Sequence, residues 1–236
     1  MNQTSADAAE IARFGELAQS SWDPKGPMRP LHRMNALRVG WIASRIRHAA
    51  ANPAEIVLLD VGCGAGLAAV ALAREGFKVL GIDPSARMIA AAKRHAAGRG
   101  LALSYQAALP EDLVGQGMRF GTITALEVIE HVTDPNRFVA ALASLLAPGG
   151  LLFLSTMSRT ARSLLAAKIG AEYVLRLLPR GTHDWRRFIT PPEMRRTLAA
   201  SGLRLADIAG MTFDPVTGVW KESRDTAINY IVMAVG

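Results

Sequence analysis

The sequence has 236 residues, 50% of them apolar, and a formal net charge of +7 at pH 7. That length and composition suffice for one substantial core and show no break that would require a second domain. The single cysteine, Cys63, excludes an internal disulfide and a zinc site built on cysteines. No run of eighteen apolar residues is found, and residues 1–19 lack a basic segment followed by an apolar one, so we expect a cytoplasmic protein without a spanning helix or signal peptide.

Two helices are expected first, over residues 10–23 and, with Asn35 as its N-cap, over residues 35–50. Strand patterns and helix patterns then alternate. Strands are expected at 56–62, 78–83, 101–109, 120–126, 151–157, 203–211 and 229–235. Further helices are expected at 67–76, 85–98, 135–150 and 190–202. The βαβα order predicts an α/β fold with a parallel, doubly wound sheet.

The positive charge is concentrated after the fifth expected strand. Residues 159–196 hold nine Lys or Arg side chains against three acidic ones, a net charge of +6. Such a patch suits the phosphates of nucleic acid or of lipid headgroups, and equally a plain solvated surface. Within it, charged side chains recur every fourth residue on an otherwise apolar helix pattern: Lys168, Glu172, Arg176 and Arg180. Residues 163–180 are then a lid packed on the sheet or a lid seated on a membrane, and we favour the membrane.

A glycine-rich turn follows the first expected strand and precedes a helix. Gly62, Gly64 and Gly66 would let the backbone turn tightly beside a ligand, and the helix N-terminus offers unpaired N–H groups. Asp83 ends the second expected strand, seventeen residues after Gly66. A carboxylate there can bind both hydroxyls of a ribose. The alternatives are a plain strand-to-helix turn and an Asp83 that only caps the next helix.

The pattern D-x-G-C-G-x-G, which begins at Asp60, and the later turn "LLAPGG" resemble class I S-adenosylmethionine-dependent methyltransferases over residues 56–157. A buried carboxylate near a sulfonium or amino group is compensated by the opposite charge, whereas near a pyrophosphate it would be repelled. Asp60 therefore favours S-adenosylmethionine over a dinucleotide as the cofactor.

Motifs outside this core resemble the ubiquinone-biosynthesis O-methyltransferases. They are "SWDPKGPMRPLHRMNALR" at 21–38, "EVIEH" at 127–131 and "PRGTH" at 179–183, in which Arg180 replaces the family's lysine. The resemblance extends over nearly the whole chain. It implies methylation of a hydroxyl on a polyprenyl-substituted catechol ring, as in demethylubiquinol, with Arg38 and Leu126 completing the cofactor site.

Two carboxylates and an imidazole, those of Glu127, Glu130 and His131, follow the fourth expected strand. If this stretch is helical, their spacing places them on one face, close enough to share a cation. The family resemblance implies a magnesium-type ion there. The alternative is a site without metal, in which His131 caps a turn or positions substrate. The expected base is His131, assisted by Glu127, with His183 as the second candidate. His183 could equally be an exposed residue beside a helix N-cap.

We therefore expect a Rossmann-like, doubly wound, mostly parallel sheet of seven strands with an antiparallel last strand. One domain would comprise a helical cap (1–50), a cofactor-binding core (51–157), an amphipathic basic insertion (158–192) and a C-terminal helix and strands (193–236). The expected partners are a polyprenyl phenol or catechol, an anionic membrane surface and a complex of ubiquinone-biosynthesis proteins. Nucleic acid is not expected, because the basic segment has few aromatic residues to stack on bases. Two alternatives stay open: a methyltransferase that acts on another phenolic or lipid substrate, and a basic RNA-directed module.

Overall fold

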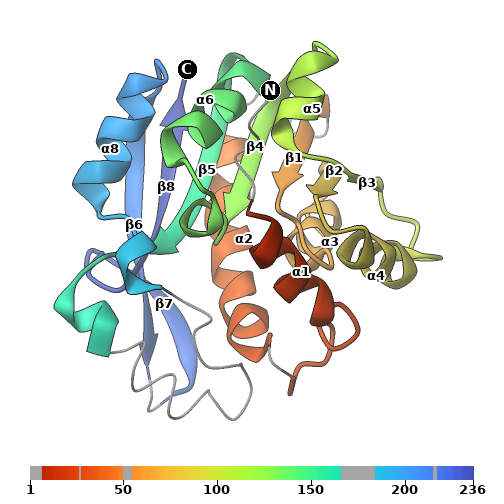
Figure 1. Cartoon of the computed structure of the whole chain (residues 1–236), viewed down its shortest axis with the longest axis horizontal. Helices are drawn as coiled ribbons and strands as arrows, with labels where there is room; N and C mark the ends of the chain where they lie inside the picture. The colour runs from red at the N-terminus through yellow and green to blue at the C-terminus, as the bar shows by residue number, and fades with distance from the viewer. Residues whose placement is uncertain (1–6, 27, 50–54, 166–183, 215–216) are drawn as a thin grey trace.

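The computed structural model describes residues 7–26, 28–49, 55–165, 184–214 and 217–236 (Figure 1). Its centre is one eight-stranded sheet with the strand order β3-β2-β1-β4-β5-β8-β6-β7. The strands are β1 (Val57–Val61), β2 (Lys78–Asp83), β3 (Leu103–Ala107), β4 (Phe120–Leu126), β5 (Leu146–Met157), β6 (Arg204–Asp214), β7 (Val219–Ser223) and β8 (Asn229–Val235). The α-helices are α1 (Ala8–Glu16), α2 (Arg29–Ala49), α3 (Leu67–Arg74), α4 (Ala86–Ala96), α5 (Pro110–Gly115), α6 (Pro135–Leu145) and α8 (Pro191–Ala200). Two short 3-10 helices are η2 (Ile129–His131) and η3 (Trp185–Arg187).

The sheet is parallel from β3 to β5 and antiparallel beyond it. β8 pairs antiparallel with both β5 and β6, and β7 pairs antiparallel with β6. In the parallel part, Asp60 on β1 lies in register with Gly81 on β2 and Thr124 on β4. The strand order reverses between β1 and β4, and in open α/β sheets the crevice at such a point is where ligands bind. The predicted Rossmann-like class and the antiparallel last strand are confirmed.

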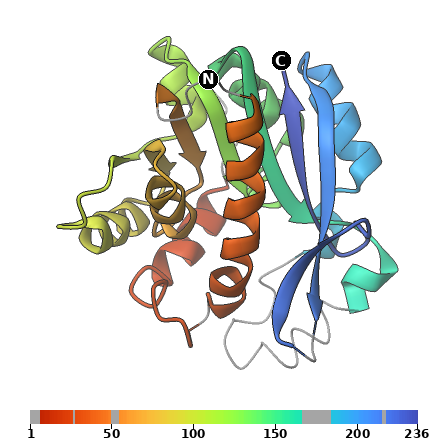
Figure 2. The ribbon, with the colours of Figure 1, turned by 180° about the vertical axis from the view of Figure 1, so that it is seen from behind.

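Helices cover both faces of the sheet, and each face has its own apolar core. On one face, α5, α6 and α8 pack through buried side chains such as Leu113, Phe138 and Met194. On the other, α2, α3 and α4 pack through residues such as Ile42 and Leu72. Figure 2 shows α2 lying along this second face. The prediction of a doubly wound sheet is therefore confirmed.

Several details of the predicted fold are wrong. The first helix ends at Glu16, the helix expected over 135–150 ends at Leu145, directly before β5, and α5 was not expected. The sheet has an eighth strand, β7, that was not predicted. Its sequence "VWKES" is a short edge strand with mostly exposed side chains, so it lacks the apolar pattern of a buried strand. The second helix begins at Arg29, since Pro30 is tolerated in a first helical turn. Asn35 therefore lies inside α2 and caps nothing; its Nδ2 donates to the carbonyl of Leu67, which holds α2 against the start of α3.

Helix starts elsewhere follow ordinary capping chemistry. Ser85 caps α4 through Met88 N–H, and Asp134 precedes Pro135 at the start of α6 and accepts from two backbone N–H groups. Thr190 and Glu193 form a reciprocal capping box at α8. None of the helices in the described ranges is long and apolar enough to cross a membrane.

Candidate active site

The glycine turn between β1 and α3 has the geometry expected of a ligand-binding loop. Gly62, Gly64 and Gly66 all have positive φ angles, of 65°, 53° and 88°. A Cβ atom at Gly62 would lie 2.5 Å from Val128 Cγ2, and one at Gly66 would lie 2.1 Å from the Tyr105 hydroxyl. The turn thus requires glycine both for its backbone conformation and for the close approach of its neighbours.

Asp83, the last residue of β2, lies against this turn. Its Oδ2 accepts from Gly64 N–H at 2.9 Å and its Oδ1 accepts from Ser85 N–H at 2.8 Å. Burial raises the pKa of the carboxyl group, and the two backbone donors oppose that shift. The carboxylate is therefore held in one orientation beside the glycine loop, and it also shapes the turn into α4. Ribose binding by Asp83 stays a prediction.

Asp60 on β1 is the most enclosed carboxylate of the turn, with 2% of its surface exposed. Thr124 Oγ1 donates to its Oδ1 at 2.7 Å, whereas no group in the described part of the chain bonds its Oδ2. Burial raises the pKa of Asp60 to about 6, against the opposing effects of Thr124 and Arg38. A cationic ligand would compensate such a buried charge, so Asp60 fits the sulfonium or amino group of S-adenosylmethionine.

Arg38 is a buried cation, 3% exposed, that α2 carries to the same place. Its Nη1 lies 3.6 Å from Glu127 Oε1, and burial lowers its pKa while the charges of Glu127, Asp60 and Glu130 raise it. Within the described residues, Nε and Nη1 have no hydrogen-bond acceptor. Two guanidinium nitrogens that lack a hydrogen-bond acceptor fit the carboxylate of the cofactor's amino-acid portion. Leu126, the half-buried last residue of β4, immediately precedes Glu127 and packs on the α2 side of the sheet.

The segment after β4 is not a regular helix, so the expected one-face arrangement of Glu127, Glu130 and His131 is wrong. Glu127 has a φ of 56°, a left-handed conformation that is uncommon for a non-glycine residue and that marks functional sites. Only Ile129–His131 form a single 3-10 turn. Three side chains that a helix would align therefore reach three different neighbours.

The two glutamates are held by the end of β5. Ser155 Oγ donates to Glu127 Oε1 at 2.7 Å, and Thr156 Oγ1 donates to Glu130 Oε2 at 2.9 Å. Glu130 is 3% exposed, and burial, followed by the charge of Glu127, raises its pKa well above the usual range of a glutamate. No described group bonds Glu130 Oε1. Sequence reasoning missed Ser155 and Thr156, because a strand pattern does not say which polar side chain faces a neighbouring loop.

His131 is engaged by α1. Its Nδ1 lies 2.8 Å from Glu10 Oε2, and its ring meets the Phe14 ring edge-on with centroids 5.0 Å apart. The second predicted base, His183, lies outside the described residues. The structure therefore brings Arg38, Asp60, Asp83, Glu127 and Glu130 to the β1, β2 and β4 ends of the sheet, with His131 beside them under α1.

Sequence comparison identifies the family. A model of a methyltransferase domain matches residues 33–208. A ubiquinone biosynthesis O-methyltransferase from Methylobacterium sp. (strain 4-46) is 44% identical over 98% of this chain and 95% of the relative. One from Caulobacter vibrioides is 44% identical over 97% of this chain and 94% of the relative. This chain belongs to the ubiquinone biosynthesis O-methyltransferase family.

The fold agrees with solved methyltransferase structures. The magnesium protoporphyrin IX methyltransferase from Synechocystis PCC 6803 with bound SAM aligns with a TM-score of 0.64 at 18% identity, covering 99% of both chains. The same enzyme with bound SAH aligns at 0.62 and 24% identity, over 86% of this chain and 82% of that one. At these identities the likeness shows the fold alone.

The predicted metal set is only partly assembled. No group of three or more His, Cys, Asp or Glu side chains in the described ranges is placed to hold one ion. Of the predicted ligands, only Glu127 and Glu130 still fit an ion together. The two carboxyl groups interact electrostatically, and Glu130 Oε1 is a buried oxygen without a described hydrogen-bond partner. One or two carboxylates with waters and substrate oxygens is a usual magnesium environment. His131 is directed to Glu10 and is not a member of this pair.

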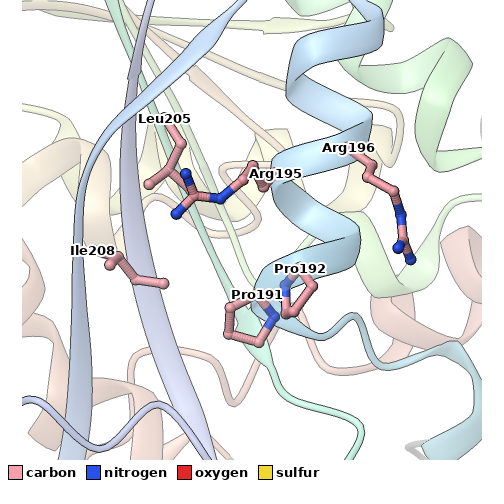
Figure 3. Close-up of a pocket in the computed structure, with 6 residues that line it drawn as sticks. All are labelled: Pro191, Pro192, Arg195, Arg196, Leu205 and Ile208. Carbon is pink, nitrogen blue, oxygen red and sulfur yellow. The ribbon is translucent and has the colours of Figure 1, made fainter.

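A separate pocket lies away from this site. It has a volume of about 360 Å³ and is lined by Pro191, Pro192, Arg195, Arg196, Leu205 and Ile208 of α8 and β6 (Figure 3). None of the predicted cofactor, base or metal residues of the family lines it. We therefore do not place the S-adenosylmethionine site there.

Proposed function

We propose that this protein transfers the methyl group of S-adenosylmethionine to a phenolic hydroxyl of a polyprenyl-substituted catechol, a step of ubiquinone biosynthesis. The observation that carries the proposal is the 44% identity to ubiquinone biosynthesis O-methyltransferases over 98% of the chain. The buried Asp60 and Arg38 and the half-buried Asp83 around the glycine turn support it, since they match the three kinds of polar group on the cofactor.

The cofactor-binding role divides among these three residues. Asp83 accepts hydrogen bonds from the ribose hydroxyls, Asp60 faces the cationic part and Arg38 binds the carboxylate. S-adenosylmethionine, when bound, supplies a methyl carbon on a positively charged sulfur. The residues around it have the task of holding that carbon in line with the acceptor oxygen, because alignment removes much of the entropic barrier.

Deprotonation of the acceptor is assigned to His131. His131 would take the phenolic proton, and the oxygen would then accept the methyl group that bound S-adenosylmethionine would supply, with its sulfur leaving as a neutral thioether. Glu127, four residues before His131, pairs with Arg38. His183 is retained as a second candidate base on the sequence motif alone.

We further propose that Glu127 and Glu130 bind a magnesium-type ion when the acceptor is present. Such an ion supplies positive charge that lowers the pKa of a hydroxyl bound to it. Chelation is then expected to lower turnover and added magnesium to restore it, while S-adenosylmethionine binding persists. Glu130→Gln should lose the response to magnesium, and Glu111→Gln, on α5, is the matched control that should retain it. Unchanged turnover in metal-stripped wild-type protein would remove the ion from the proposal.

The membrane is the proposed source of the substrate, because a polyprenyl chain partitions into the bilayer. The support is the +6 charge of residues 159–196, which suits anionic headgroups. Most of the amphipathic segment 163–180 lies outside the described residues; at its start, Leu165 is 59% exposed. We propose a cytoplasmic protein at the membrane surface, working beside other ubiquinone-biosynthesis proteins.

The direct test is product analysis with methyl-labelled S-adenosylmethionine. Polyprenyl catechols and demethylubiquinol in phosphatidylglycerol vesicles are compared with soluble catechols, with RNA as a further acceptor. We expect O-methylated polyprenyl products, and rates that fall as salt screens the vesicle charge. Equal rates on soluble catechols without vesicles would favour another phenolic substrate, and label in RNA would favour the nucleic-acid alternative.

A further inference from the structure

Helix α1 is fastened over the carboxyl ends of the strands at several points. Asp7 caps the helix and lies 3.4 Å from Arg187 Nη2 of η3. At its other end, a Cβ atom at Gly15 would lie 3.1 Å from Ser85 Oγ, so the helix runs close to the start of α4. Figure 1 shows α1 beside α2 and α4 at this end of the molecule. The helix is thereby held in one place relative to the site.

One carboxylate of α1 reaches into the site from this position. Glu10 Oε2 lies 2.8 Å from His131 Nδ1 and also accepts from Arg13 Nη2 at 2.8 Å. The side chains of Glu10 and His131 are 19% and 15% exposed, so bulk water has little access to the pair. Phe14, one helical turn after Glu10, packs its ring edge-on against the imidazole. The imidazole is therefore restrained by a hydrogen bond and by an aromatic contact from the same helix.

This arrangement decides which imidazole nitrogen can accept a proton. A carboxylate accepts from Nδ1–H and so selects the tautomer in which Nε2 carries the lone pair. It also fixes the plane of the ring. Arg13 in turn orients the Glu10 carboxylate. We infer that Glu10 is a positioning residue that sets the tautomer and orientation of His131 for deprotonation of the acceptor hydroxyl. This inference rests on the proposed function.

The first test is steady-state kinetics on the full chain. Glu10→Ala is expected to lower kcat by about tenfold to a hundredfold, part of the factor of 10² to 10⁴ that a positioned base provides. KM for the acceptor and the affinity for S-adenosylmethionine should stay within about twofold, because Glu10 acts through His131. Glu10→Gln keeps an acceptor oxygen and should recover much of the loss.

Two matched variants separate positioning from helix docking. Asp7→Asn keeps the cap of α1 and removes the ion pair to Arg187, and Glu16→Ala changes an exposed carboxylate on the same helix. Both should retain the wild-type kcat. If Asp7→Asn loses as much activity as Glu10→Ala, the effect comes from helix docking and the inference is wrong.

The deciding measurement is a double-mutant cycle with His131→Ala. If Glu10 acts through His131, Glu10→Ala causes no further loss of kcat in the His131→Ala background. Full, multiplicative loss in that background overturns the inference. Circular dichroism and S-adenosylmethionine calorimetry confirm that each variant is folded. Failure of the wild-type protein to methylate any catechol would overturn the proposed function instead, so the two failures are distinguishable.

Discussion

Replacing Asp83 with alanine is expected to weaken S-adenosylmethionine binding by about 2–4 kcal/mol, a factor of about 30 to 1,000 in Kd. The carboxylate is largely buried and already oriented by Gly64 N–H and Ser85 N–H. Binding therefore requires no reorganisation of the carboxylate, and the variant loses charged hydrogen bonds to the ribose as well as part of the turn. Isothermal titration calorimetry with S-adenosylmethionine measures the change.

Two further variants make the Asp83 result specific. Asp83→Asn keeps the shape of the side chain and one acceptor oxygen, so we expect an intermediate loss of affinity. Ser85→Ala removes the α4 cap at Met88 N–H and leaves the Asp83 carboxylate in place. This variant should lose some stability, on the order of 1 kcal/mol, with nearly wild-type affinity. An unchanged Kd in folded Asp83→Ala would show that the ribose is bound elsewhere.

Replacing Arg38 with methionine is expected to destabilise the protein by about 3–5 kcal/mol and to weaken cofactor binding. The substitution removes one partner of a buried ion pair and leaves the charge on Glu127 and Asp60 uncompensated. Burial raises the pKa of Asp60 to about 6, so protonation of this carboxyl group will limit the loss at pH 5, and the destabilisation should be larger at pH 8. Urea unfolding followed by circular dichroism at both pH values measures it.

Arg45, two turns along the same helix, is the matched control. It pairs with Asp207 and Glu222 at the surface and packs on the Trp41 ring, with its side chain 25% exposed. Arg45→Met should cost about 0–1 kcal/mol for the solvated ion pairs, with a small addition from the ring contact. Equal destabilisation by the two substitutions would contradict a special role for the buried Arg38.

The order of strands and helices and the place of the cofactor turn could be predicted from the sequence, because both depend on local patterns. Buried strands are mostly apolar runs, and helices have an apolar stripe. The strand Val57–Val61 and the helix Leu67–Arg74 can therefore be predicted from the pattern of side chains in the sequence. Glycines that must adopt positive φ stand together at one turn. Asp83 ends the next strand, and neighbouring parallel strands bring their carboxyl ends to one edge of the sheet.

Partners distant in the chain were decided only by the tertiary structure. Glu10 and His131 are 121 positions apart, and nothing in the sequence around either residue predicts that they form a hydrogen bond. The left-handed conformation of Glu127 places its carboxylate beside Ser155 at the end of β5, whereas the spacing of the sequence alone left a helix possible there. β7 forms because β6 offers it an edge to pair with. Local periodicity depends on neighbours along the chain, whereas hydrogen bonds, ion pairs and sheet edges depend on which segments folding brings together, and that information is spread over the whole sequence.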